Sequence, residues 1–168
     1  ALLILLLHFV SSFPKESSGS VAADHKRGYE FRGENGTAVR LTSWELEEVQ
    51  GIYDTIMRFS GPDDWVIALP YSPTVNLMTN RRSYLHNLYV DNATAPPHWV
   101  EETVQGFEER RPAVVLIDNR DINGTEASRF RNWAYPVYRY LLDHYIYVGT
   151  YDWSDLFVHP HHYHAANR

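Results

Sequence analysis

The sequence contains no cysteine, so disulfide bonds and thiolate metal sites are excluded. A chain without cysteine is compatible with a bacterial periplasm or a cytosol, and is less typical of a small secreted eukaryotic domain. Basic residues are not in excess either, since 21 Asp and Glu outnumber 15 Lys and Arg. Because a nucleic-acid-binding protein needs a basic face, we expect no nucleic-acid partner.

Short sequence motifs of the common enzyme classes are also missing. The sequence has no G-x-S-x-G nucleophile motif, no Walker A loop, no G-x-G-x-x-G after a predicted strand and no H-E-x-x-H zinc motif. A free-standing secreted hydrolase is therefore disfavoured. We predict that the chain carries no catalytic residue and needs no cofactor.

Two segments contain residue types that bind metals, and neither meets a metal-site template. In residues 118–126, only Asp121, Asn123 and Gly124 follow the EF-hand spacing, and a turn explains them as well. Residues 159–164 contain four histidines, a residue type that binds zinc, copper or nickel. Because His-rich chain ends are commonly disordered, we interpret residues 160–168 as a His-rich tail and predict no metal site.

One apolar run stands at the beginning of the sequence. Residues 1–10 are apolar apart from His8, whereas a complete membrane span needs about 20 such residues. The charged flank of a secretory signal does not precede this run. We interpret residues 1–13 as the end of a transmembrane helix, and the polar residues 14–41, which begin with a Ser-rich stretch, as a linker.

Residues 42–159 carry the alternating pattern of an α/β domain. Thr42 and Glu45 have the spacing of a capping box, and the Ser-Gly-Pro sequence at residues 60–62 ends the helix that follows. Further helices are predicted over residues 72–79, from 96 to about 107, and around Pro136, where the helix either kinks or begins near Tyr135; strands are predicted over residues 65–69, 113–118 and 145–151, with a short edge piece over 156–158. This order predicts a small, largely parallel sheet with helices on both faces, a Rossmann-like layer.

The middle of this domain resembles a known family. A strand ends at Leu69 and Pro70, Tyr71-Ser72-Pro73 opens a short helix, and Thr79-Asn80-Arg81-Arg82-Ser83-Tyr84 follows. Downstream come the strand Pro-Ala-Val-Val-Leu-Ile-Asp, an aromatic-rich helix and Tyr-Ile-Tyr-Val-Gly-Thr at residues 145–150. This pattern, with the apolar run before it, is similar to the C-terminal extracytoplasmic domain of GT-C superfamily membrane glycosyltransferases, of the type that includes dolichyl-phosphate-mannose-protein mannosyltransferases and aminoarabinose transferases.

The resemblance implies a polytopic enzyme that moves a sugar from a polyprenyl-phosphate donor to a lipid, protein or glycan acceptor. It implies an integral membrane protein with this domain on the periplasmic or extracytoplasmic side, whose partners are the membrane, the lipid-linked sugar donor, the acceptor and the upstream transmembrane part of the same protein. The catalytic acidic residue of that family lies in the first extracytoplasmic loop, and no position here corresponds to it. The alternative is a membrane-tethered, non-enzymatic binding or sensory α/β domain.

A pair of arginines, Arg81 and Arg82, is one candidate substrate-binding site. Two guanidiniums can hold a lipid phosphate through paired charged hydrogen bonds, and Tyr84 beside them can stack on a sugar ring. The structural alternative, which we favour, is that one arginine bridges the loop to an acidic residue such as Asp91 while the other is solvated.

The residues that follow two predicted strands form a second candidate. Tyr71 follows the first strand, and Asp118 and Asn119 end the second. Because α/β sheets bind ligands beyond the carboxyl ends of their strands, these side chains are expected to converge at one edge if the strands are parallel neighbours. The alternative is that Asp118 and Asn119 cap the turn that follows them.

Overall fold

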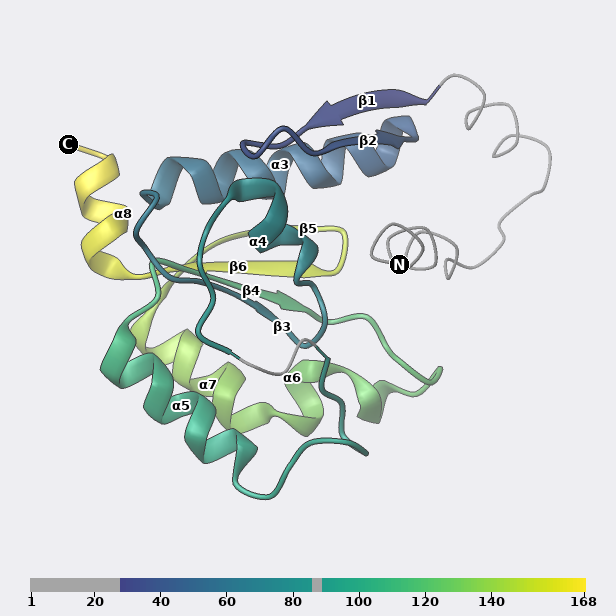
Figure 1. Cartoon of the computed structure of the whole chain (residues 1–168). Helices are drawn as coiled ribbons and strands as arrows, with labels where there is room; N and C mark the ends of the chain where they lie inside the picture. Colours follow the sequence, from purple (N-terminus) through teal and green to yellow (C-terminus); the bar gives the residue numbers. More distant parts are fainter. Residues whose placement is uncertain (1–27, 86–88) are drawn as a thin grey trace.

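The computed structural model describes residues 28–85 and 89–168, which form three layers with a sheet between two layers of helices (Figure 1). The elements are β1 Tyr29–Arg32, β2 Ala38–Leu41, α3 Ser43–Phe59, β3 Val66–Leu69, α4 Thr74–Thr79, α5 Trp99–Arg110, β4 Val114–Asp118, a 3-10 turn Glu126–Ser128, α6 Phe130–Trp133, α7 Tyr135–His144, β5 Ile146–Tyr151, β6 Ser154–Val158 and α8 Pro160–Ala166. The predicted end of a transmembrane helix, residues 1–13, lies outside the described residues. Among the described helices, none has the length and apolar character needed to span a bilayer.

The central sheet has four strands in the order β3-β4-β6-β5, and it is mixed. Only β3 and β4 are parallel, with Leu69 opposite Ile117, whereas β6 pairs antiparallel with both β4 and β5. The prediction of a largely parallel sheet was therefore wrong. The physical reason is the connection between β5 and β6, residues 152–153, because a parallel pair needs a crossover of a dozen or more residues.

The position of the last strand within the sheet was also predicted wrongly. Residues 156–158 were expected as a short edge piece, but they belong to β6, which lies between β4 and β5 inside the sheet. Leu156, Phe157 and Val158 are fully buried. Both faces of the strand are therefore covered over these residues, which agrees with the apolar run at positions 156–158.

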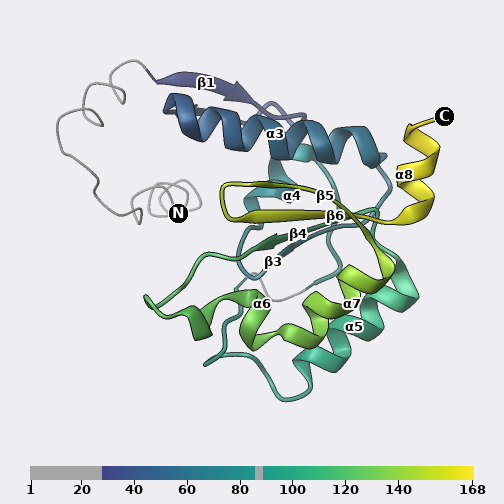
Figure 2. The ribbon, with the colours of Figure 1, turned by 180° about the vertical axis from the view of Figure 1, so that it is seen from behind.

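Successive residues of β4 point to opposite faces of the sheet, and each face has its own core. Val114 and Leu116 pack with residues of α3 and α4, whereas Val115 and Ile117 pack with residues of α5, α6 and α7. All five residues of β4 are buried. The predictions of an α/β fold and of helices on both faces are confirmed, as Figure 2 shows from behind.

Helix α3 begins at the predicted capping box. The Thr42 backbone amide donates to Glu45 Oε2 at 2.8 Å, and the Glu45 amide donates to Thr42 Oγ1 at 3.4 Å. One face of the helix is apolar, and its residues Ile52, Ile56 and Phe59 are buried against the sheet. The expected helix start near Tyr135 is also confirmed, since Pro136 lies in the first turn of α7, where a missing amide is tolerated.

Two segments outside the predicted domain core are folded. Residues 29–41, expected as part of the linker, form the β1–β2 hairpin, where Phe31 is 2% exposed and packs edge-on against Tyr53 of α3. Residues 160–166, expected as a tail, form α8, and Tyr163 stacks on Phe59 at 5.6 Å between ring centroids. Both segments are folded for the same reason, because each gains apolar contacts with α3.

Candidate functional site

The carboxyl ends of β3 and β4 meet at one edge of the sheet because the two strands are parallel neighbours. Tyr71 follows β3 and its hydroxyl donates to the Arg120 carbonyl, 3.4 Å away, just beyond the end of β4. The structure therefore brings Tyr71 and Asp118 to the same edge, as the sequence predicted. We call Glu48, Tyr71, Tyr89, Asp118 and Arg120 the edge cluster.

The buried part of the edge cluster is an ion pair between Asp118 and Arg120. Asp118 is 0% exposed, and the Arg120 guanidinium binds both of its oxygens, with Nε at 3.1 and 3.0 Å and Nη2 at 2.6 Å. The Arg120 backbone amide adds a hydrogen bond to Asp118 Oδ1 at 2.9 Å. This two-point geometry fixes the guanidinium plane, and the Arg120 side chain keeps 23% of its surface exposed.

Glu48, from the first half of α3, brings a titratable carboxyl to the same edge. Its pKa is raised from 4.5 to about 7, chiefly by burial; the charge of Arg120 opposes this rise, and the nearby carboxylates of Asp152 and Asp118 add to it. Near neutral pH this group therefore exchanges between a hydrogen-bond donor and an acceptor. Glu48 could not be recognised from the sequence, because the direction in which α3 packs was not predictable.

The edge cluster contains two tyrosine rings. Tyr71 and Tyr89 are stacked with centroids 5.7 Å apart, and Tyr89 is 52% exposed. Burial is the main cause that raises the pKa of the Tyr71 hydroxyl, so this group stays protonated in any physiological condition. The edge thus combines an aromatic surface with a guanidinium and carboxyl groups.

Asn119, the third residue predicted at this edge, is committed to internal hydrogen bonds. Its Nδ2 donates to Asp155 Oδ2 at 2.6 Å, and its Oδ1 accepts from the Arg131 amide at the start of α6 at 3.0 Å. Asp155 also accepts from the Tyr138 hydroxyl at 2.8 Å. Asn119 is 3% exposed, so it positions α6 and does not face a ligand.

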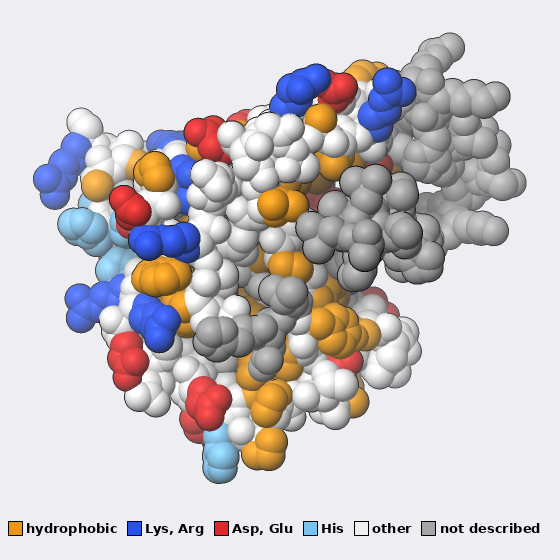
Figure 3. All heavy atoms as spheres, in the orientation of Figure 1, with side chains coloured by type: hydrophobic (Ala, Val, Ile, Leu, Met, Phe, Trp, Pro, Cys, Tyr) orange, Lys and Arg blue, Asp and Glu red, His pale blue; other side chains and the backbone are white. Residues whose placement is uncertain are grey.

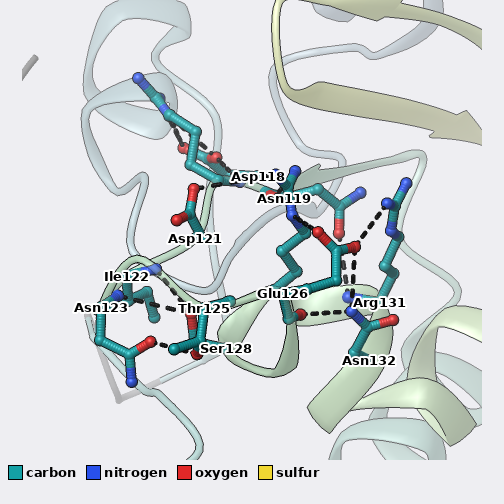
Figure 4. Close-up of polar contacts among 12 residues, drawn as sticks. Asp118, Asn119, Asp121, Ile122, Asn123, Thr125, Glu126, Ser128, Arg131 and Asn132 are labelled. Atoms are coloured by element: carbon teal, nitrogen blue, oxygen red, sulfur yellow. Dashed lines mark hydrogen bonds and ion pairs between the residues drawn. The ribbon is translucent and has the colours of Figure 1, made fainter. Parts of the chain in front are cut away.

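The loop after β4 is held by its own side chains, as Figure 4 shows. Ser128 Oγ accepts from the Ile122 amide at 3.1 Å and donates to the Thr125 carbonyl at 2.7 Å. Glu126 pairs with Arg129 at 2.5 Å and with Arg131 at 2.9 Å. The carboxylates of this segment are thus bound to arginines rather than arranged around an ion, and the described residues contain no group of three or more His, Asp or Glu that could hold a metal.

Arg81 and Arg82 lie at the other end of the sheet, and they point to different partners. Arg81 is 8% exposed and donates to Ser60 Oγ at 3.0 Å, the Ser60 carbonyl at 2.9 Å and the Thr79 carbonyl at 2.8 Å. The Arg82 carbonyl accepts from the Val66 amide where β3 begins, at 2.9 Å. Arg81 therefore stabilises the ends of α3 and α4, and the two guanidiniums do not form one anion site.

Arg82 and Tyr84 belong instead to a cluster of aromatic rings and guanidiniums, in which Arg82 is exposed and Tyr84 is half-buried. Arg82 lies over the Trp65 ring at 4.9 Å and pairs with Asp63 at 3.5 Å, while Arg110 lies over the Tyr84 ring at 4.7 Å. Figure 3 shows Lys or Arg side chains gathered near α8 and the end of α5. The expected acidic partner Asp91 is not used, since it accepts from Thr94 and Ala93 in its own turn.

Of the six residues predicted to bind substrate, three lie beyond the carboxyl ends of β3 and β4, and three lie near the amino end of β3. Tyr71, Asp118 and Asn119 lie at the first, and Arg81, Arg82 and Tyr84 at the second. Comparison of the chain with protein-family models, with curated proteins and with solved structures found no match.

Proposed function

We propose that this chain is the C-terminal extracytoplasmic domain of a polytopic membrane glycosyltransferase, and that its edge cluster binds the sugar of the donor or of the acceptor. The observation that carries the proposal is the meeting of Tyr71, Arg120 and Glu48 beyond the ends of two parallel strands. In α/β sheets this is the usual position of a ligand.

The chemistry of the edge cluster favours sugar hydroxyls over a phosphate group. One guanidinium, that of Arg120, is already paired with Asp118, and further carboxyls from Glu48 and Asp152 lie close by. A dianionic phosphate would meet a surplus of negative charge there. A sugar ring instead finds an aromatic surface in Tyr71 and Tyr89, and donors and acceptors in Arg120 and Glu48.

The position at which β1 begins supports a ligand that is shared with the part of the protein before residue 28. Strand β1 begins at the same end of the molecule at which β3 and β4 end (Figures 1 and 2). The edge cluster therefore lies on the end of the domain that is joined to the preceding segment. A role beside a catalytic centre in that preceding part, without a catalytic residue in this domain, fits this arrangement.

The coding sequence upstream of Ala1 tests the proposal first. We expect many apolar spans and paired acidic residues in the first exterior loop, and the complete protein in lipid vesicles should transfer sugar from a polyprenyl-phosphate donor. Replacing those acidic residues should abolish transfer while leaving this domain folded. A single span before residue 28 would contradict the proposal and favour a tethered binding or sensory domain.

A further inference from the structure

Three aromatic rings are exposed at the end of the domain where the chain enters at residue 28. Tyr29, the first residue of β1, is 49% exposed, and Trp44, in the first turn of α3, is 46% exposed. Trp153, in the turn between β5 and β6, is 43% exposed. We call these three residues the aromatic rim. Of the five tryptophans in the chain, Trp44 and Trp153 are the two that are exposed.

Backbone pairings bring the three residues of the aromatic rim to one end of the sheet. Tyr29 stands opposite Leu41, the last residue of β2, and α3 follows with only its capping residue between. Tyr29 therefore lies beside the first turn of α3, which contains Trp44. The Trp153 carbonyl accepts from the Asn119 amide at 2.9 Å, so Trp153 lies just beyond the carboxyl end of β4.

The first half of α3 lies beside the turn that contains Trp153. Glu48, one helical turn after Trp44, lies near the carboxylate of Asp152, and Asp152 is the chain neighbour of Trp153. Figures 1 and 2 show the start of β1, the start of α3 and the β5–β6 turn at the same end of the molecule. The aromatic rim therefore surrounds the end of the domain that also carries the edge cluster.

The aromatic rim consists of the two residue types that are enriched at membrane–water interfaces. Trp and Tyr combine an apolar ring with a polar group, which suits the headgroup region of a bilayer. Polar groups such as Glu48 and Asp152 lie between Trp44 and Trp153. The rings therefore do not form the contiguous apolar core of a stable protein interface, whereas lipid headgroups accommodate separate rings.

The position of the preceding segment favours a bilayer as the partner. Residues 1–13 are the predicted end of a transmembrane helix, and residues 14–27 connect it to the domain. Even at full extension this connection is no longer than about 50 Å, so the end of the domain with the aromatic rim stays near the bilayer. Contacts that are weak singly can then hold the domain, because the connection keeps the rings at a high effective concentration.

We propose that the aromatic rim lies in the headgroup region of the bilayer and holds this end of the domain on the membrane surface. The edge cluster then lies at the level of the headgroups, so the sugar that it binds is one attached to a lipid. The inference rests on the membrane anchor of the proposed function and not on sugar transfer. It applies equally to a tethered binding domain.

Quenching of tryptophan fluorescence by brominated lipid tests this contact on the full 168-residue chain. Residues 1–27 contain no tryptophan, so the signal comes from the folded domain alone. The probe is a vesicle of phosphatidylcholine brominated near the headgroup end of the acyl chains, compared with a vesicle of the unbrominated lipid. We expect quenching of the original chain, and Trp44→Phe and Trp153→Phe should each remove about half of the quenched intensity.

Trp65→Phe is the matched control. Trp65 lies at the opposite end of the sheet, where its backbone forms a bridge with Arg82 before β3 begins. Its replacement should leave the quenched intensity unchanged. Circular dichroism during thermal unfolding checks that all three variants are folded.

The proposal is overturned if the chain does not bind the vesicles, if the bound chain is not quenched, or if Trp44→Phe and Trp153→Phe keep the quenched intensity of the original chain. Dimers whose exposed tryptophans are shielded from brominated lipid would assign the aromatic rim to a second copy instead. Failure of the proposed function is a separate result. Sugar transfer without quenching would contradict only the aromatic rim, and quenching with a single upstream span would contradict only the transferase.

Discussion

Asp118 and Arg120 stand two residues apart at the end of β4, and the buried carboxylate binds the guanidinium through both oxygens. The pair explains why a charged residue can end a strand whose other positions are all apolar. It also explains how Arg120 reaches the sheet edge in one fixed orientation. Asp118 therefore acts on the site through Arg120, because it has no exposed surface of its own.

Removing the charge of Asp118 should destabilise the domain strongly. Asp118→Asn leaves the Arg120 guanidinium partly buried without its counter-charge, and we expect a loss of about 2–4 kcal/mol in the free energy of unfolding. Urea unfolding measures this. The control is Asp143→Asn, which breaks an exposed bridge to Arg139 and should change stability by less than about 1 kcal/mol. Equal small losses in both variants would contradict the role assigned to the pair.

Substitution of Arg81 should destabilise the domain more than substitution of its neighbour Arg82. Arg81→Ala removes three hydrogen bonds to Ser60 and Thr79 in a buried position, and should lower stability by about 2–3 kcal/mol. Arg82→Ala removes an exposed pair with Asp63 and should lower it by less than about 1 kcal/mol. Thermal unfolding of the two variants checks the difference. If both variants unfold like the original chain and both weaken donor binding, the arginines form an anion site after all.

Local sequence signals predicted local structure well. The capping box of Thr42 and Glu45 and the position of Pro136 depend only on neighbouring residues, and both helix starts are as expected. The convergence of Tyr71 with Asp118 also followed from sequence, because it needs only two adjacent parallel strands. Features of this kind are fixed within a few residues or by one strand pairing.

Features that depend on distant contacts were missed. The place of β6 between β4 and β5 is set by long-range pairing, and a short apolar run reads the same at an edge or in the centre of a sheet. The burial of Arg81 depends on where the end of α3 lies, and the helix α8 depends on Phe59 as a stacking partner. Glu48 was missed for the same reason, since only the packing of α3 brings it to the edge.

The stability of the domain should fall as the pH rises through neutrality because of Glu48. Its folded pKa, about 7, lies above the ordinary value of 4.5, so the fold favours the protonated form and loses that stabilisation between about pH 5 and pH 8. At pH 8, Glu48→Gln should raise the free energy of unfolding by about 1–2 kcal/mol relative to the original chain, because glutamine carries no charge to be buried. At pH 4 it should change the free energy of unfolding little. Urea unfolding across this range is the measurement, with Glu47→Gln, an exposed neighbour on α3, as control. A variant no more stable than the original chain at pH 8 would contradict the burial of Glu48.

Gly51→Ala should destabilise α3 although alanine is the better helix former. The new methyl group collides with the Tyr151 ring, and we expect a net loss of about 1–2 kcal/mol. In a Tyr151→Ala background the same substitution should instead gain about 0.5–1 kcal/mol, the ordinary preference of a helix for alanine. A double-mutant cycle by urea unfolding checks the change of sign. The same sign in both backgrounds would show that Tyr151 does not lie against Gly51.

The binding of sugar at the edge cluster is tested most directly by steady-state transfer kinetics of the complete protein in lipid vesicles. We predict that the double variant Tyr71→Ala/Tyr89→Ala raises KM for donor or acceptor by about tenfold while kcat stays within about threefold. Tyr135→Ala, at a similarly exposed tyrosine on α7, should leave both constants unchanged. A folded double variant with the KM values of the original protein would contradict the assignment of this edge as the sugar-binding site.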